Sequence, residues 1–459
     1  MPRHHVRADL SSRLSFWALV CFLILLWIAG GASRADAAGQ ALVRFSAWAI
    51  LIGVVLTVPR FDWRQVSRPI VLMGITIAFV AIQLIPLPPA LWTALPGRGL
   101  LGDAAVAIGD EQPWRPLSIS PSATANALGS LIVPVVILLL AANLTRVQHG
   151  RIATLLLGLT VAGSLLGLLQ FSGAHFDHPL VNDTEGLISA NFANRNHFAL
   201  FLAIGCVVAL TWAFGYRGAR WKFFVGAGTV LLFALMILAT GSRMGLLLGV
   251  IGVFLGLMIV RRRIFEEFRK LPPKVSVAIA LLSVTLVAGP VLLSITLDRA
   301  VSIERILMLD ASVDLRAQVT PIVVDMIGRY WPIGAGFGTF DPAFRIVEPD
   351  SFLSPLYFNH AHSDWLEIVL DGGLAAALLL ATILVWFVRR SLVVWGRNGR
   401  TASPLGQIGS AIILLVLVAS IVDYPARTPM IMALLTMAAA WLATDKPASM
   451  KPEGSRSFR

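Results

Sequence analysis

Long apolar runs alternate with short polar connections along the whole chain. The runs are close to 20 residues long, the length that an α-helix needs to cross a hydrocarbon core of about 30 Å. Short alternating segments, typical of a transmembrane β-barrel, are absent from the sequence. The pattern predicts an all-α polytopic membrane protein, with one integral membrane domain over residues 1–459. We place its twelve spans at residues 14–32, 41–58, 69–86, 124–143, 152–170, 197–214, 223–240, 244–260, 276–297, 364–388, 405–422 and 429–443.

Charge is scarce and unevenly distributed. Only 14% of the residues are charged, against about 25% in soluble domains. With a cytoplasmic N-terminus, 25 of the 37 Lys and Arg but only 6 of the 25 Asp and Glu fall in segments assigned to the cytoplasm, which include the tail at 444–459. Basic residues mark cytoplasmic loops. The net charge of +12 therefore reflects topology, and we expect membrane lipids but no nucleic acid as partners.

Three external segments are long, at residues 87–123, 171–196 and 298–363. The last is the largest and directly precedes the tenth span. Residues 1–38 also fit a cleaved signal peptide, with a basic start, an apolar middle and small residues after it. Cleavage there would leave the downstream topology unchanged. The two cysteines lie inside apolar runs, so the sequence offers no disulfide framework.

Unusual polar residues gather at the external ends of the spans. The spans hold almost no ionisable residue at mid-depth, which argues against a transporter or pump. If the bundle is compact, four external loops can converge on one cavity. The candidate residues in these loops are Asn194, Arg195, His197, Arg243, His360, His362 and Arg427.

Two of the arginines have the chemistry to hold a diphosphate. A guanidinium forms bidentate, charge-assisted hydrogen bonds with phosphate oxygens. Arg195 lies among asparagines, and Arg243 lies in a turn of about three residues that restricts its side chain. The competing interpretation is an arginine that only extends toward lipid headgroups, and it applies most directly to Arg427.

The histidine pair His360 and His362 admits three interpretations. As zinc ligands the two would need a third ligand, from His175, Asp177 or His178, or from Asp183 and Glu185. Nothing in the spacing ties these segments together, so we expect no metal and no cofactor. As a base, one neutral imidazole at a helix N-terminus is enough, and Ser363 or Asp364 is the expected N-cap. The third interpretation is a histidine that only satisfies local backbone groups.

The chain resembles the O-antigen ligase/polymerase superfamily of bacterial envelope glycan assembly. The resemblance is carried by the order and spacing of IQLIPLPPALWTALPGR, NFANRNHFA, GSRMGLLLG, MIGRYWPIGAGFGTF, HAHSDWLEIVLDGGL and VDYPARTP. His362, Ser363 and Gly373 fit the family motif H-[NS]-x9-G-x-x-[GTY], while Ala376 departs from its last position. Arg243 to Leu247 fits R-x-x-x-L, and Arg195 falls where the family has its other essential arginine, without repeating that motif.

The resemblance implies a fold like glycosyltransferase C, in the bacterial inner membrane, with 298–363 as a periplasmic loop. It implies inverting, metal-independent transfer from an undecaprenyl-diphosphate-linked glycan to lipid A-core or a growing polysaccharide. His362 would be the base, and Arg195 and Arg243 would hold the diphosphate. Ligase, polymerase, protein-glycosylating and exopolysaccharide branches stay open. The rival classes are a lipid-linked oligosaccharide flippase or other transporter, and a non-enzymatic scaffold.

Overall fold

The structure is a computed structural model of the chain. It describes residues 2–58, 61, 63, 66–109, 111–174, 178–182, 186–214, 220–269, 315–353, 358–396 and 404–444. The predicted span at 276–297, the candidate ligands His175, Asp177, Asp183 and Glu185, and the tail from 445 onward lie outside these residues.

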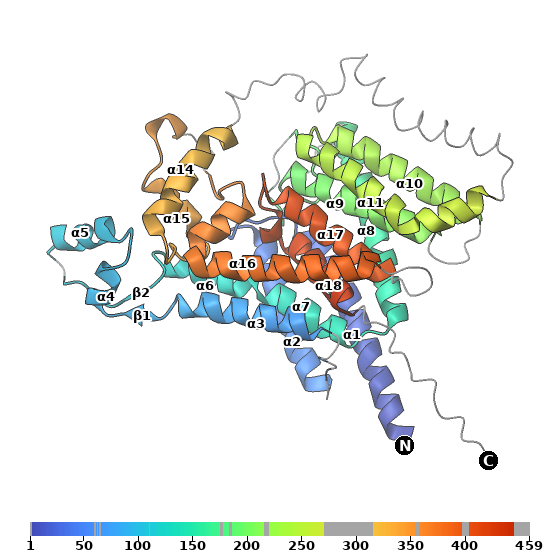
Figure 1. Cartoon of the computed structure of the whole chain (residues 1–459), viewed down its shortest axis with the longest axis horizontal. Helices are drawn as coiled ribbons and strands as arrows, with labels where there is room; N and C mark the ends of the chain where they lie inside the picture. The colour runs from blue at the N-terminus through green and yellow to red at the C-terminus, as the bar shows by residue number, and fades with distance from the viewer. Residues whose placement is uncertain are drawn as a thin grey trace.

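The described chain is almost entirely helical (Figure 1). Two strands, β1 (Pro86–Leu87) and β2 (Arg115–Pro116), form one short antiparallel pair. The α-helices are α1 (Pro2–Ala29), α2 (Ala38–Thr57), α3 (Ser67–Ile82), α4 (Pro89–Thr93), α5 (Gly99–Ala107), α6 (Pro121–Ser130), α7 (Ile132–Ala142), α8 (Arg146–Phe171), α9 (Arg195–Phe214), α10 (Arg220–Ala239), α11 (Arg243–Phe268), α14 (Leu315–Tyr330), α15 (Phe340–Arg345), α16 (Asp364–Gly396), α17 (Pro404–Ala419) and α18 (Pro429–Thr444). Short 3-10 turns are η2 (Asp350–Phe352) and η4 (Pro425–Arg427).

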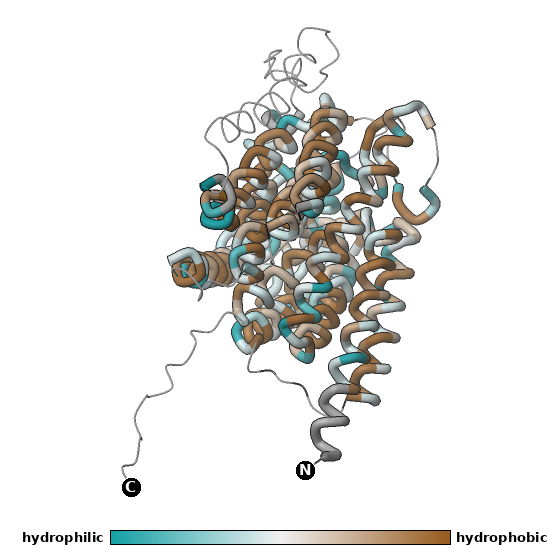
Figure 2. Tube along the Cα trace, turned by 90° about the vertical axis from the view of Figure 1, so that its right-hand side faces the viewer, coloured by the Kyte–Doolittle hydropathy of each residue, from teal (hydrophilic) through white to brown (hydrophobic). Residues whose placement is uncertain are grey.

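The predicted spans correspond closely to these helices. Eight of them coincide with helices that are long and apolar enough to cross a membrane, with α6 and α7 together making one. Three more coincide with the shorter apolar helices α3, α17 and α18. The all-α polytopic class is therefore confirmed, while the count of twelve stays a prediction. Apolar residues dominate the tube in Figure 2.

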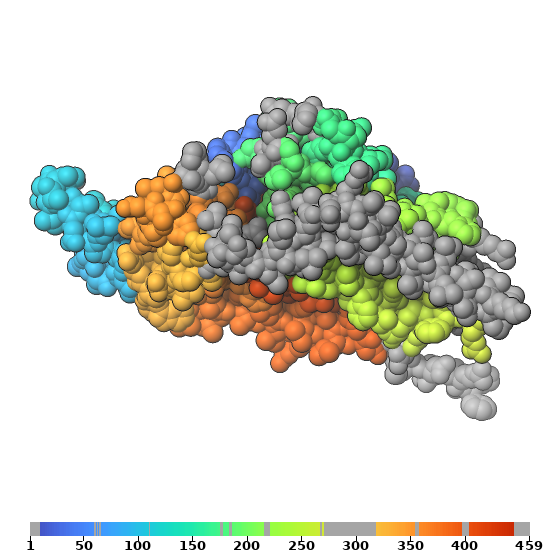
Figure 3. Space-filling model, turned by 90° about the horizontal axis from the view of Figure 1, so that it is seen from above, coloured from blue at the N-terminus to red at the C-terminus, as the bar shows by residue number. Residues whose placement is uncertain are grey.

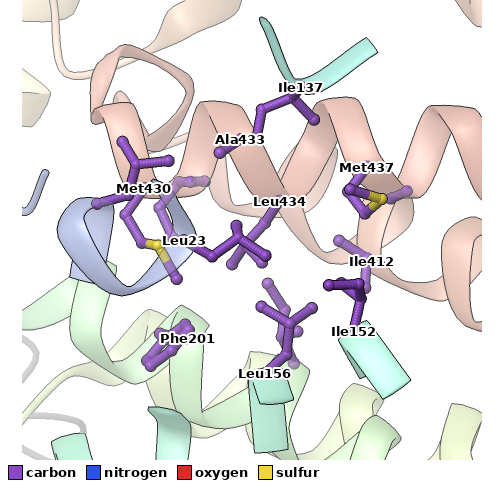
Figure 4. Close-up of a cluster of buried hydrophobic side chains, with 14 of the residues drawn as sticks. Leu23, Ile137, Ile152, Leu156, Phe201, Ile412, Met430, Ala433, Leu434 and Met437 are labelled. Atoms are coloured by element: carbon purple, nitrogen blue, oxygen red, sulfur yellow. The ribbon is translucent and has the colours of Figure 1, made fainter. Parts of the chain in front are cut away.

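Helix α9 is the centre of the bundle. In the most apolar stretch of α9, 89% of the residues are buried, which is the largest share among the eight candidate spans. It packs against α8, α10, α11 and α17. Figure 4 shows part of the apolar core, in which Phe201 of α9 belongs to the same cluster as Leu156, Ile412 and Leu434 of other helices. Because this core fixes α9, the polar loop at its amino end also has a fixed position.

Small residues let α11 approach α9 closely. A Cβ atom at Gly252 would lie 2.5 Å from the Ala203 carbonyl oxygen, and one at Gly245 would lie 2.5 Å from the Ala199 Cβ. Close approach through small residues is the usual way that membrane helices pack. It holds the start of α11, and therefore Arg243, beside the start of α9.

A second, smaller core lies at one end of the bundle. It is formed by α14, α15 and the first turns of α16, with Val323, Phe340 and Leu370 fully buried. This core occupies most of the described part of the predicted 298–363 loop, and that described part is folded against the bundle. Next to it, α4 and α5 project from the body of the molecule (Figure 3).

Arg98 anchors the projecting segment to this core. Its guanidinium donates to the carbonyls of Leu117 (2.7 Å) and Gly334 (3.1 Å) and lies over the Tyr330 ring. Burial lowers the pKa of Arg98 to about 10. The guanidinium therefore has a structural role, because its hydrogen bonds to backbone carbonyls join the segment at Leu117 to the turn at Gly334.

Two glycine positions shape the entry to α16. Gly373 has φ +58°, and a Cβ there would lie 2.0 Å from the Pro332 carbonyl oxygen. Its non-helical backbone divides α16 into a short first part and a long span. Gly336, with φ +114°, leaves space for Ser118 in the same way, so the GAGFG segment can form a tight turn. These close contacts hold the first part of α16 against the smaller core.

Candidate functional site

Asp423 joins the loop before α9 to the turn before α18. Its carboxylate accepts hydrogen bonds from the side-chain amides of Asn194 (3.2 Å) and Asn196 (2.6 Å). It also lies 3.5 Å from Nε2 of His197, whose Nδ1 is 2.9 Å from the Thr428 hydroxyl. Asp423 and His197 are both 2% exposed, so this is a buried polar network rather than a solvated rim. Asn194 and His197 therefore hold two loops together.

A third loop joins the same network through Ser242. Its hydroxyl donates to the side-chain amide oxygen of Asn196 at 2.7 Å and accepts from the Gly245 backbone N–H at 2.8 Å, which caps α11. The turn contains only three residues between α10 and α11, as predicted, and Gly241 adopts φ +65°. Arg243 is exposed, and it makes no hydrogen bond or ion pair with any other described residue. Arg195, the first residue of α9, is half-buried.

The two histidines before α16 flank the Tyr424 ring. The His360 ring lies 4.4 Å from Tyr424 and the His362 ring 5.2 Å from it, measured between ring centroids. His362 has a left-handed backbone, φ +52°, and its ring also packs edge-on against Phe358. Ser363 directly precedes α16, as its expected cap. The histidine loop and the turn before α18 therefore form one unit.

His360 belongs to a buried ion cluster that includes Glu367 and Arg427. Nδ1 of His360 is 3.0 Å from one oxygen of Glu367, and the other oxygen accepts from the Ala361 backbone N–H at 2.9 Å. Nη1 of Arg427 lies 3.1 Å from the same carboxylate. Glu367 is fully buried. A carboxylate in this position fixes the orientation of the imidazole and leaves its other nitrogen available.

Arg427 makes two further ion pairs. Its Nε lies 3.4 Å from Asp364, and its Nη2 lies 3.4 Å from Asp371. Burial alone would lower the pKa of Arg427, but the carboxylates of Glu367, Asp371 and Asp364 outweigh it and raise the pKa above its usual value. The charge of Arg427 is therefore balanced by carboxylates of the protein itself, and the interpretation as an arginine that extends toward lipid headgroups is wrong.

A cavity of about 810 Å³ opens beside this cluster. Among the candidates from the sequence, His360 and Arg427 line it. Arg195, Arg243 and His362 are not among the described residues that form its wall. The remaining wall comes from the segment before α2, from α2, α3, α6 and α7, from the turn at 337–338 with α15, and from α16 and α18. The four loops converge as expected, but only part of that convergence faces this space.

A second cavity of about 270 Å³ is apolar and adjoins the first. It is lined mainly by α3, α16, α17 and α18. Both cavities share Thr76, Asp364, Ile368 and Ala426 in their walls. A polar space and an apolar space therefore meet at the start of α16.

Comparison with protein families gives a match over part of the chain. Residues 227–381 match the family model described as O-antigen ligase. Over these residues the chain is similar to the O-antigen ligase family. The matched segment, roughly a third of the chain, contains Arg243, His360 and His362 but neither Arg195 nor Arg427. No curated protein matches the chain.

The metal interpretation finds no support in the described residues. They contain no group of three or more His, Cys, Asp or Glu side chains that fits a metal ion. His178, the one described candidate ligand of the GAHFDHP segment, accepts from the Leu180 backbone N–H at 3.3 Å. Metal independence stays a prediction, because Asp183 and Glu185 lie outside the described residues.

Three acidic residues of the site were missed from the sequence, although a signal for them exists. Asp364, Glu367 and Asp371 are spaced i, i+3 and i+7, which places them on one face of a helix. Three carboxylates on one face of an apolar helix require a cation, and Arg427 supplies it. Asp423 had no comparable signal, because its partners Asn194 and Asn196 are more than 200 residues away.

Proposed function

We propose that the protein is a membrane glycosyltransferase that moves a glycan from undecaprenyl diphosphate to an acceptor hydroxyl on the periplasmic side. The observation that carries this proposal is the junction of the polar and apolar cavities beside the histidine loop. A lipid-linked sugar has both a polar group and an apolar chain, and the two spaces fit these two parts. The match of residues 227–381 to the O-antigen ligase family model supports the same class of reaction.

The charge pattern supports an external site in an inner membrane. Most of the connecting segments in the wall of the larger cavity, at 33–36, 120, 337–338, 359–360 and 426–427, belong to parts of the chain that the positive-inside pattern assigns outside. Both termini would then be cytoplasmic. This topology, with a fold like glycosyltransferase C, is part of the proposal.

In the proposed reaction, His362 takes the proton from the acceptor hydroxyl as its oxygen attacks the anomeric carbon. The bond from that carbon to the diphosphate oxygen breaks, and its electron pair leaves with undecaprenyl diphosphate, so the anomeric configuration inverts. Arg195 and Arg243 hold the diphosphate and offset its growing negative charge. No residue becomes covalently attached to the sugar, and no metal takes part.

His360 is a second candidate for the base, on a specific observation. It lines the cavity and is held by Glu367, whereas the family motif favours His362. A histidine oriented by a carboxylate is a common arrangement for proton transfer. Separate alanine variants of the two histidines distinguish the candidates.

The test is a transfer assay with the purified protein in a maltoside detergent, using an undecaprenyl-diphosphate-linked glycan and an acceptor. We expect a glycosylated acceptor and free undecaprenyl diphosphate, with unchanged turnover in EDTA. Loss of turnover in EDTA that Mg²⁺ or Mn²⁺ restores would contradict metal independence and favour Asp183 and Glu185. Movement of intact donor across a vesicle membrane, without cleavage, would favour a transporter instead.

Product analysis in a deletion strain separates the branches of the superfamily. Loss of capped lipid A-core identifies a ligase, and caps with a single repeat identify a polymerase. Loss of secreted polysaccharide identifies the exopolysaccharide branch.

A further inference from the structure

Arg44 of α2 lines the larger cavity, far in sequence from the residues discussed so far. It belongs to a helix that is long and apolar enough to cross a membrane. Its Nη1 donates to the Asn126 side-chain oxygen of α6 at 2.6 Å, and its Nη2 lies 3.5 Å from the Gln40 side-chain oxygen. Ionisable residues in such helices are costly and usually serve a function.

The charges around the cavity leave Arg44 without a counter-ion. Each other charged residue of the wall has a partner of opposite sign: Arg34 pairs with Asp36, Arg427 with Asp364, and Asp341 with Arg345. Arg44 has only the two amide oxygens among the described residues. Its Nε is buried and lacks a hydrogen-bond partner there as well. Among the charged residues of the cavity wall, Arg44 is therefore the one whose positive charge no described carboxylate balances.

Neutral polar residues of α6 line the same cavity as Arg44. Ser122, Asn126 and Ser130 of α6 line the space, and Ser120 lies directly before that helix. Hydroxyl and amide groups can donate to an anion without opposing its charge. Thr76 of α3 also lines this space, and it borders the apolar cavity too. An anion at Arg44 can therefore belong to a molecule whose apolar part extends toward α16.

We infer that Arg44, with Asn126 and the α6 serines, binds a phosphate or diphosphate group of an amphiphilic substrate, with the apolar chain of that molecule directed into the smaller cavity. A guanidinium matches phosphate oxygens in geometry and charge. The identity of the substrate as a lipid-linked diphosphate rests on the proposed function. The assignment of Arg44 rests only on the cavity and its charges.

Binding of farnesyl diphosphate and of inorganic pyrophosphate to the full-length protein tests this inference. Calorimetry in a maltoside detergent is suitable, because that detergent carries no phosphate. We expect Arg44→Gln to weaken farnesyl diphosphate binding roughly tenfold or more, since a hydrogen bond to a charged group contributes about 1.5–3 kcal/mol. Arg329→Gln, which removes an exposed arginine of α14 outside the cavity wall, is the matched control and should bind as the wild type does.

A second variant protects the test against misfolding of Arg44→Gln. Asn126→Asp keeps Arg44 but places a carboxylate at its partner, and it should weaken binding similarly. If both variants bind farnesyl diphosphate as tightly as the wild type, the inference is wrong while the proposed function stands. If the wild type binds neither probe, the inference fails together with the proposed donor class. Equal binding of the two probes would contradict the claim that the ligand is amphiphilic, and it would indicate a site for free phosphate or pyrophosphate.

Discussion

Two arginines, Arg427 and Arg44, line the same cavity in opposite electrostatic settings. Arg427 lies within 3.4 Å of three carboxylates, while Arg44 contacts only amide oxygens among the described residues. The comparison shows that lining a cavity does not by itself make an arginine a ligand for an anion. A guanidinium whose charge is already balanced positions its neighbours, whereas one without a counter-ion has electrostatic capacity left for a substrate.

The largest difference between the two arginines should appear in stability. Arg427→Gln leaves three carboxylates without their cation, and removing one partner of a buried ion pair costs about 3–5 kcal/mol. Arg44→Gln breaks hydrogen bonds with neutral partners and should cost about 1 kcal/mol or less. Denaturant titration of the purified variants in mixed micelles measures both free energies of unfolding. Equal stability of the two variants would remove the distinction drawn here.

A smaller effect is expected when the cluster keeps its shape but loses one charge. Glu367→Gln removes one of three carboxylates that face a single arginine, so the like-charge repulsion among them falls. It also weakens contacts with His360 and the Ala361 N–H, each worth about 1–3 kcal/mol when a buried partner is lost. We expect a net loss of about 1–2 kcal/mol, less than for Arg427→Gln, by the same titration. A loss as large as that of Arg427→Gln would show that Glu367, and not Arg427, is the centre of the cluster.

The smallest loss of stability is expected for a substitution of Ser242, in the loop before Arg243. Ser242→Ala removes the cap of α11 and one hydrogen bond to Asn196, which should cost about 1 kcal/mol. Ser242→Thr keeps a capping hydroxyl and is the matched control. A loss above about 3 kcal/mol for the alanine variant would mean that the Asp423 network depends on Ser242 more than its single contact to Asn196 indicates.

Much of the fold could be predicted from hydrophobic periodicity. The lengths of apolar runs located the membrane helices, because burial in lipid requires a run of fixed length. The short turn around Gly241 and the positions of the candidate loops at helix ends followed from the same pattern.

The composition of the cavity wall could not be predicted, because it depends on how distant helices pack. In the sequence Arg44 lies near the start of the predicted span 41–58, and only its contact with Asn126 of α6 distinguishes it. His360 looked like a spare neighbour of His362, and only its contact with Glu367 and its place in the wall distinguish it. Local spacing identifies which residue types lie at one helix end, but tertiary contacts decide which of them share a space.

The most direct measurement of the central claim is the rate of glycan transfer by the purified His362→Ala variant, compared with the wild type and with His360→Ala. Loss of a general base lowers turnover about 10²–10⁴-fold. We predict such a loss for His362→Ala, with unfolding behaviour like that of the wild type. Near-normal turnover of a folded His362→Ala variant would contradict its assignment as the base. The same result for both histidine variants would contradict base catalysis at this loop altogether.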